Sequence, residues 1–387
     1  MKRFIAIFSA LMIFSSIVPL QGMASEKKLN LAENAKSAIL IERDTGAVIF
    51  EKNSDEKLPP ASMTKIMTML LIMEAISDGK IQLDDKVRTS EYAASMGGSQ
   101  IFLEEGEEMT VDEMLKAIAI GSANDASVAM AEKIAGSEEN FVDMMNAKAK
   151  ELGLKNTKFQ NSTGLPAEDH YSSARDMAVM AKELLKYEEI TKYTSMYEDY
   201  LREGTDKKFW LVNTNRLVKF YPGVDGLKTG YTNEAKYCLT ATAKKGNMRT
   251  IAVVMGAPTP KDRNKQITQM FDYAFSQYET KPFYSKNEKI GEFPIKKGER
   301  RKLKAVAGES VSLLVKKGEK VDNVKKQLVI NKDLKAPIKK GTEIGKIVIS
   351  KDGKVLAENS IIAAEDMNSA SWWTLFKRSF GMFTKIQ

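Results

Sequence analysis

The chain has 387 residues, of which 43% are hydrophobic and 28% charged, a composition that allows more than one folded domain and excludes a disordered chain or an integral membrane bundle. Its 59 Lys and Arg residues exceed the 51 Asp and Glu residues, an imbalance that suits an anionic surface such as phospholipid, wall polymer or nucleic acid. Nucleic acid is the weakest of these partners, because the chain has neither zinc-finger spacing nor an aromatic-basic RNA motif. A single cysteine, Cys238, and a single histidine, His170, exclude an intrachain disulfide and most zinc sites.

Residues 1–24 have the pattern of an export signal. Lys2 and Arg3 precede an apolar run, and the small residues that follow place the expected cleavage after Ala24. The alternative is an uncleaved membrane helix, but Pro19 ends the run short of the roughly 20 residues that a span needs. The mature protein is therefore expected outside the cytoplasm, where Cys238 in "YCLTATA" is expected to be a strand-core residue.

Residues 25–281 are expected to form one α+β domain, with an antiparallel sheet and helices grouped against it. Two strand-like runs surround a turn at residues 44–46, and helical patterns dominate from residue 62 to 186. Two alternating runs then flank Gly246-Asn247, which is a hairpin signal, and residues 264–279 read as an amphipathic helix.

The composition changes after about residue 281. Residues 282–366 are expected to form a small β-rich domain, because Lys-Lys-Gly recurs at 296–298, 316–318 and 339–341 between short β-branched runs. The lysines are most simply solvated edge and turn residues; a specific binding patch is the alternative.

Residues 367–387 predict a C-terminal amphipathic helix. At 100° per residue its large apolar side chains, from Trp372 and Trp373 to Ile386, cover one half of the wheel, and Lys377 and Arg378 lie on the other. This pattern fits a helix in the interface of an anionic membrane, with the protein held peripherally on the outer face of the cytoplasmic membrane. A terminal helix docked on the protein is the alternative.

The stretch "ASMTKIMTML" places Ser62 and Lys65 on one face of an otherwise apolar helix that follows two prolines. A buried ammonium is expected to lose its proton and act as a base toward the neighbouring hydroxyl. The backbone N–H of Ser62, near the helix start, can also donate to an oxyanion. His170 lies in a polar, turn-like segment where an exposed, inert histidine is expected, so an enzyme here needs a different base.

Two further motifs accompany the first. "IGSANDAS" places Ser122 and Asn124 in a tight turn between two helices, where simple helix capping is the alternative interpretation. "VDGLKTGYT" places Lys228-Thr229-Gly230 near a strand start, where a cation and a hydroxyl can hold a carboxylate and glycine lets a substrate backbone lie close. A solvated edge lysine is the alternative for Lys228, whose charge near Lys65 is expected to lower the pKa of Lys65.

Serine-x-x-lysine, serine-x-asparagine and lysine-threonine-glycine in this order resemble the penicillin-recognising serine acyltransferases. The resemblance narrows to the low-molecular-mass penicillin-binding proteins that act as D-alanyl-D-alanine carboxypeptidases. It covers nearly the whole chain, including "GSQIFLEEGEEMTV", "LGLKNTKFQNSTGL", "HYSSARDMA", the β-rich second domain and the C-terminal anchor. A β-lactamase/transpeptidase-like fold is implied for residues 25–281.

The resemblance also implies roles for individual residues. Ser62 is similar to the family's acylated nucleophile, Lys65 to its general base, and Ser122 to the group that relays a proton to the leaving amine. Asn124 matches the residue that bonds the substrate amide. The family's substrate-binding positions correspond to Lys228, Thr229 and Gly230, of which Lys228 and Thr229 would orient the substrate. The backbone N–H groups of Ser62 and Tyr231 would form the oxyanion hole, and Arg263 aligns with an arginine that helps bind the substrate carboxylate. Tyr231 stands where relatives often have histidine, so only its backbone is carried over.

The implied reaction removes the terminal D-alanine from peptidoglycan stem peptides through an acyl-enzyme that penicillin also forms, without metal or organic cofactor. A class A-like β-lactamase is a rival, but no E-x-x-L-N segment lies between Asn124 and Lys228. A DD-endopeptidase is chemically adjacent, and a non-catalytic wall-binding factor is the rival from another class. The layout is also similar to relatives from spore-forming bacteria, which adds sporulation as a possible context.

Overall fold

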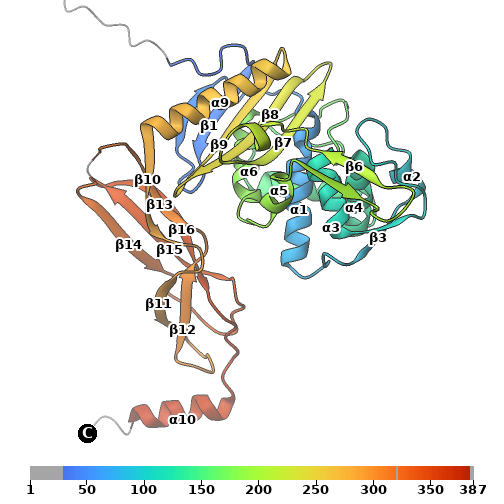
Figure 1. Ribbon diagram of the computed structural model, residues 1–387. Coiled ribbons are helices and arrows are strands. Elements are labelled where there is room, and N and C mark those ends of the chain that lie inside the picture. The colour runs from blue at the N-terminus through green and yellow to red at the C-terminus, as the bar shows by residue number, and fades with distance from the viewer. Residues whose placement is uncertain (1–28, 320, 384–387) are drawn as a thin grey trace, which may run out of the picture. The chain divides into compact units, whose positions relative to one another are not determined.

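The computed structural model describes residues 29–319 and 321–383, so the expected signal peptide lies outside the described part of the chain. A five-stranded antiparallel sheet with the strand order β2-β1-β9-β8-β7 forms the centre of the first domain (Figure 1). Its strands are β1 (Ser37–Glu42), β2 (Val48–Lys52), β7 (Val224–Thr232), β8 (Lys236–Lys245) and β9 (Met248–Ala257). Because β1 and β2 precede the helices while β7 to β9 follow them, both ends of the domain contribute to one sheet.

Two predicted hairpins form as expected. In the β1–β2 turn the Glu42 carboxylate accepts hydrogen bonds from the backbone N–H groups of Asp44 and Thr45. The β8–β9 turn is closed by Gly246-Asn247, where Gly246 has a positive φ of 58°. The predicted α+β fold with an antiparallel sheet is therefore confirmed.

The sheet is buried on both faces, which explains why β1 reads as a continuous apolar run. Ile39 and Ile41 point into the core with the grouped helices, whereas Ala38 and Leu40 point to the opposite face. There α9 (Pro260–Gln277) covers the sheet, and the predicted amphipathic helix is thus present with an earlier start. Cys238 of β8 is fully buried, as predicted.

The helical region lies between β2 and β7 in sequence. Its central helix, α1 (Lys65–Ser77), is buried on nearly every side and contacts α4, α5 and α6. A capping box of Thr110 and Glu113 starts α3. Apart from α1, this region contains η1 (Ala61–Thr64), α2 (Glu91–Ala94), α3 (Val111–Lys116), the π-helical segment η2 (Ala117–Gly121), α4 (Asn124–Ala135), α5 (Glu138–Glu151), α6 (Ala174–Leu184), α7 (Ile190–Thr194), α8 (Leu217–Phe220) and the antiparallel strand pairs β3–β4 (Lys86–Arg88, Glu108–Thr110) and β5–β6 (Glu198–Leu201, Phe209–Val212).

The second domain is β-rich, as predicted. It contains the pair β10 (Tyr278–Tyr284) and β13 (Val311–Lys316), and a sheet of order β11-β12-β16-β15-β14. Its own apolar core includes Leu303, Ile347 and Ile361. The Lys-Lys-Gly triplets lie at the turns between strands. The sheet strands are β11 (Lys289–Pro294), β12 (Lys302–Ala307), β14 (Val324–Ile330), β15 (Glu343–Lys351) and β16 (Lys354–Ala363).

A final helix, α10 (Trp372–Phe383), forms where the amphipathic pattern predicts one. The guanidinium of Arg378 donates hydrogen bonds to the carbonyl oxygens of Gly298 and Glu299, at 2.7 and 2.6 Å. Trp372 is 72% exposed and Trp373 is 55% exposed. Among the described residues, no helix has both the length and the apolar character needed to cross a membrane.

Candidate active site

Ser62 lies in a turn, here called the Ser62 turn (residues 59–64), that is wedged between two glycine backbones. A Cβ atom on Gly164 would lie 1.9 Å from the carbonyl oxygen of Ala61, and one on Gly230 would lie 2.7 Å from that of Pro60. The loop and strand β7 approach the turn this closely because both positions lack a side chain. At Gly230 the structure thus shows close packing of β7 against the Ser62 turn.

Lys65 begins α1 and stacks above Ser62, although Ser62 itself lies in the 3-10 turn η1 rather than in the predicted α-helix. The Lys65 side chain is fully buried, and its Nζ lies 3.2 Å from Ser62 Oγ. Nζ also donates to Asn124 Oδ1 at 2.6 Å and to the Thr163 carbonyl oxygen at 2.7 Å. Both of these partners can only accept, so the two hydrogens of a neutral amine satisfy them and leave the lone pair for the Ser62 hydroxyl.

The surroundings of Lys65 favour that neutral amine. Burial, and then the positive charge of Lys228, hold the pKa of Lys65 well below its usual range. The predicted like-charge effect of Lys228 is therefore confirmed. Asp125 opposes the shift, but its carboxylate accepts from the backbone N–H groups of Ile101 and Leu103 and makes no ion pair with Lys65.

Ser122 and Asn124 lie in the predicted turn between helices, at the junction of η2 and α4. Ser122 is buried in a left-handed conformation with a φ of 62°. Asn124 connects this turn to the Ser62 turn, because its Oδ1 accepts from Lys65 while its Nδ2 donates to the Gly97 carbonyl oxygen at 2.7 Å. The hydroxyl of Ser122 has no hydrogen-bond partner in the part of the chain that the structure describes, which leaves it available to a ligand.

The loop after α5 supplies a contact that the sequence motifs do not reveal. Ser162 donates from its backbone N–H and its hydroxyl to Glu138 Oε1, at 2.9 and 2.6 Å. Thr68 of α1 donates to the Ser162 carbonyl oxygen at 2.6 Å. These bonds hold the next residue, Thr163, whose carbonyl oxygen accepts from Lys65. The signal for this loop is the string of short polar residues in "QNSTG", which alone predicts only a turn.

Lys228 and Thr229 lie within β7, not near its start as predicted. Lys228 is buried, and burial together with the charge of Arg263 lowers its pKa to about 7. The alternative of a solvated edge lysine is therefore wrong. Thr229 Oγ1 donates to Thr214 Oγ1 at 2.7 Å. Thr214 is a further residue that motif reasoning missed; it lies in a loop that Asn213 holds through bonds to backbone carbonyls.

Arg263, in the first turns of α9, is a buried cation without an acidic partner. In the described part of the chain, its side chain donates only to Asn264 Oδ1, at 3.1 Å from Nε and 3.0 Å from Nη2. Burial lowers the pKa of the guanidinium to about 10. Within the described residues, neither Lys228 nor Arg263 forms a salt bridge, so this part of the domain holds positive charge that a ligand carboxylate can neutralise.

Tyr231 follows Gly230 in β7 and is half exposed. Its hydroxyl donates to Asn233 Oδ1 at 3.1 Å, and its ring packs on Tyr237 with centroids 4.5 Å apart. The Tyr231 side chain is thus held by contacts with Asn233 and Tyr237. Only the backbone N–H remains for the predicted role, and Gly230 brings this part of β7 against the Ser62 turn.

The prediction that His170 is exposed is wrong, because the side chain is only 7% exposed. His170 Nδ1 accepts from the backbone N–H of Gln160 at 3.1 Å, so Nε2 carries the proton and donates to Thr64 Oγ1 at 2.8 Å. Burial lowers the pKa of the imidazole to about 4, which keeps it neutral. His170 therefore connects its loop to the Ser62 turn and does not contact Ser62.

This arrangement can perform acyl transfer. It offers a hydroxyl beside a desolvated amine, a second buried hydroxyl at Ser122, and unpaired cations for an anionic substrate. In the described part of the chain, His, Cys, Asp and Glu side chains form no cluster of three that could hold a metal ion.

The comparisons with known proteins agree with this chemistry. Residues 23–259 match the family model described as D-alanyl-D-alanine carboxypeptidase, and residues 278–369 match the C-terminal domain of penicillin-binding protein 5. The chain is 67% identical to D-alanyl-D-alanine carboxypeptidase DacF of Bacillus subtilis over 92% of each chain.

Solved structures show the same relationship. Penicillin-binding protein 5 from Haemophilus influenzae is 33% identical and superposes with a TM-score of 0.67, covering 87% of this chain and 98% of that one. Penicillin-binding protein D2 from Listeria monocytogenes, solved with ampicillin bound, is 29% identical with a TM-score of 0.58, covering 64% and 100%. This chain therefore belongs to the D-alanyl-D-alanine carboxypeptidase family.

Proposed function

We propose that Ser62 is the nucleophile through which this D-alanyl-D-alanine carboxypeptidase removes the terminal D-alanine of peptidoglycan stem peptides. The observation that carries the assignment is the fully buried Lys65 amine, 3.2 Å from Ser62 Oγ and without an acidic partner among the described residues. An amine in that state is a base at neutral pH, and the Ser62 hydroxyl is the group that it can deprotonate.

In the first step Ser62 Oγ attacks the carbonyl carbon between the last two D-alanines, and Lys65 takes the hydroxyl proton. The backbone N–H groups of Ser62 and Tyr231 stabilise the oxyanion. The C–N bond then breaks as Ser122 gives its hydroxyl proton to the leaving amine and takes up the proton that Lys65 received, which restores the neutral Lys65. In the second step water, activated by the neutral Lys65, hydrolyses the ester, so that Ser62 is restored.

Binding of the substrate carboxylate uses the unpaired positive charge. Thr229 presents its hydroxyl from β7, while Lys228 and Arg263 supply the charge that favours an anion. Asn124 orients the substrate amide, with its side chain held by Lys65 and Gly97. The Thr229 hydroxyl, which donates to Thr214, turns its hydrogen to the carboxylate when the substrate binds, and the Thr214 hydroxyl then donates to Thr229 Oγ1.

β-Lactams are expected to acylate the same serine. The ampicillin-bound form of penicillin-binding protein D2 is an example within the structural neighbours. Benzylpenicillin offers a strained amide and a carboxylate to the same groups as the dipeptide. The opened ring stays attached to the enzyme, because the leaving nitrogen is joined to the acyl part.

Intact-protein mass spectrometry on the mature protein with and without benzylpenicillin tests the assignment. A stable adduct of the mass of penicillin is expected, and Ser62→Ala should abolish it. Release of D-alanine from a peptide ending in D-Ala-D-Ala should be lost in the same variant. Rapid loss of penicillin without an adduct would instead indicate a β-lactamase, and an adduct that persists in Ser62→Ala would overturn the assignment of the nucleophile.

We also propose that residues 1–24 are removed on export, and that α10 holds the enzyme at the outer face of the cytoplasmic membrane. Support for the second proposal comes from Trp372 and Trp373, which are exposed on a helix too short to span a bilayer. Indole rings favour the headgroup region of lipids, and the neighbouring Lys377 can face lipid phosphate. The domain limits at residues 25–281, 282–366 and 367–387 belong to the same proposal.

A further inference from the structure

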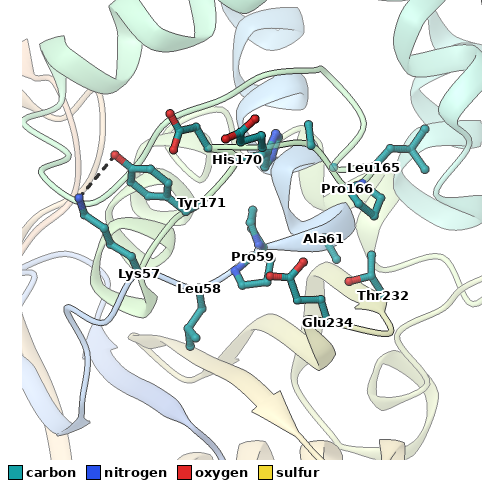
Figure 2. A pocket seen from close by; sticks show the side chains of 15 residues that line it. Lys57, Leu58, Pro59, Ala61, Leu165, Pro166, His170, Tyr171, Thr232 and Glu234 are labelled. Carbon is teal, nitrogen blue, oxygen red and sulfur yellow. Dashed lines mark hydrogen bonds between the residues drawn. The ribbon is translucent and has the colours of Figure 1, made fainter.

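The pocket beside the Ser62 turn (Figure 2) has three carboxylates and one lysine, Lys57, in its described lining, so it does not attract a polyanion. The β-rich domain has a surface of the opposite sign, here called the basic rim (residues 295–301 and 331–341). Together with the adjoining residues 364–371, the rim contains eight Lys and Arg and four Asp and Glu. The rim is therefore a candidate surface for an anionic partner.

Backbone hydrogen bonds join the two segments of the rim and connect them to the residues that lead into α10. The backbone N–H of Lys296 donates to the Leu334 carbonyl oxygen, and the Lys296 carbonyl oxygen accepts from Ala336, both at 2.9 Å. The backbone N–H of Ala370 donates to the Lys297 carbonyl oxygen at 2.8 Å, two residues before α10 begins. The rim and the start of α10 thus lie at the same end of the β-rich domain.

The rim has more cations than its own acidic groups can neutralise. Each of the four acidic side chains pairs with a cation; the pairs are Asp333–Lys296, Glu365–Arg300, Asp366–Lys339 and Glu299–Arg300, at 2.7, 2.6, 3.5 and 3.9 Å. Five further cations have exposed side chains that form neither an ion pair nor a hydrogen bond in the described part of the chain; they are Lys297, Arg301, Lys332, Lys335 and Lys340. Lys335 is directed outward because its neighbours Leu334 and Ala336 are buried in the apolar core.

We propose that the basic rim binds the phosphates of anionic phospholipid headgroups and forms a second contact with the membrane beside α10. The lipid follows from continuity, because residues 367–370 bond to the rim and lead directly into the exposed Trp372 and Trp373. Arg378 of α10 also donates to two carbonyl oxygens of the rim. Indole rings favour headgroup depth, where neighbouring ammonium groups meet lipid phosphate. A soluble polyanion offers these rings no apolar partner. This assignment rests on the proposed attachment through α10.

Two triple variants with the same change of charge test the proposal. The rim variant replaces three unpaired cations: Lys297→Gln, Lys335→Gln and Lys340→Gln. The control variant replaces three exposed lysines near the β15–β16 turn: Lys316→Gln, Lys325→Gln and Lys354→Gln. The rim directly precedes β15, whose nine residues place this turn about 30 Å away, which is several Debye lengths at 0.1 M salt.

Sedimentation of the mature protein with vesicles of phosphatidylcholine and increasing phosphatidylglycerol is the measurement. The rim variant should bind phosphatidylglycerol vesicles at least about tenfold more weakly than the wild-type protein, and the control variant should stay within about twofold. On pure phosphatidylcholine all three proteins should bind equally, because the indole rings are unchanged. Benzylpenicillin acylation and urea unfolding at the wild-type midpoint verify that the variants are folded.

A rim variant that binds anionic vesicles as well as the control variant does overturns the proposal. Loss of binding to soluble poly(glycerol phosphate) with unchanged vesicle binding would assign the rim to a wall polymer and overturn the lipid assignment. Failure of the attachment through α10 looks different: deletion of residues 369–387 leaves vesicle binding unchanged, whereas the rim variant still reduces it. A wild-type protein that does not bind anionic vesicles overturns both proposals.

Discussion

At the scale of single residues, the site depends on side chains that are buried without the partners they would have elsewhere. Among the residues that the structure describes, Lys65 has three hydrogen-bond partners but no counter-ion, and Lys228 donates only to the Thr229 carbonyl oxygen, at 3.1 Å. Burial therefore lowers the pKa of both amines. The sequence predicts the lowered pKa of Lys65 from its apolar neighbours. It does not predict that Thr163 contacts Lys65 or that Thr214 contacts Thr229, because no sequence motif marks a backbone carbonyl or a loop hydroxyl.

Lys228→Gln should move the acidic limb of the acylation profile to higher pH. Lys65 acts as a base only when neutral, so acylation rises as the pH rises through its pKa. Removing the charge of Lys228 stabilises the ammonium form of Lys65 and raises that pKa. The measurement is the second-order rate constant for benzylpenicillin acylation from pH 5 to 10. Lys261→Gln, an exposed lysine of α9, is the matched control, and a limb that stays in place or moves to lower pH would contradict the coupling.

His170→Gln should reduce the loss of stability in mild acid. The pKa of the buried imidazole is about 4, against about 6.5 when unfolded. Above pH 6.5 neither state binds the proton; as the pH falls toward 4 only the unfolded state binds it, which costs roughly 3 kcal/mol of stability by pH 4. Glutamine can accept from Gln160 and donate to Thr64 without titrating. Urea unfolding at pH 7.5 and 4.5 checks this, and an equal loss in both proteins would argue against the buried histidine.

At the scale of elements, the position of Ser62 follows from backbone packing. The Ser62 turn touches the loop at Gly164 and β7 at Gly230, with no side chain at either contact. Apolar runs and periodic patterns predicted β1, the β8–β9 hairpin and α9, because the apolar side chains of each element recur at the spacing of its secondary structure. They could not predict that a 3-10 turn precedes α1, or that His170 is buried, since both depend on loops packing from distant parts of the chain.

Gly164→Ala should lower both stability and acylation. Gly164 has a φ of 84°, and its added Cβ would meet the Ala61 carbonyl oxygen. Gly136 has a similar φ of 82° with nothing within 4 Å of its Cβ position, so Gly136→Ala isolates the conformational cost of about 1 kcal/mol. Gly164→Ala should lower the free energy of unfolding by at least about 2 kcal/mol more than Gly136→Ala does, and it should slow benzylpenicillin acylation more than tenfold. Urea unfolding and acylation kinetics of the two variants decide; equal effects would contradict the packing argument.

At the scale of the whole molecule, the positive charge is unevenly distributed. Residues 282–366 contain 20 Lys and Arg and 12 Asp and Glu, an excess of eight that equals the net charge of the entire chain. The β-rich domain and α10, which Arg378 joins to it, are thus the parts best suited to an anionic surface. The sequence predicts the change of composition that separates the domains, because turn triplets and β-branched runs are local features.

Deletion of residues 369–387 should release the mature protein from anionic lipid vesicles. The reason is the loss of the exposed Trp372 and Trp373 together with the basic side chains of α10. Sedimentation with vesicles containing phosphatidylglycerol is the measurement, and benzylpenicillin acylation of the soluble fraction verifies that the truncated protein is folded. Co-sedimentation as strong as that of the longer protein would show that α10 is not the anchor.

The buried charges of Lys228 and Arg263 also affect how long ligands stay bound. These two side chains repel each other, since the charge of Arg263 lowers the pKa of Lys228. On the proposed mechanism a D-alanine carboxylate relieves this repulsion on binding, and the relief ends when the amino acid departs. A β-lactam keeps its carboxylate attached after the ring opens, so the relief lasts as long as the acyl-enzyme. The same charges thus favour turnover of the peptide and retention of the antibiotic.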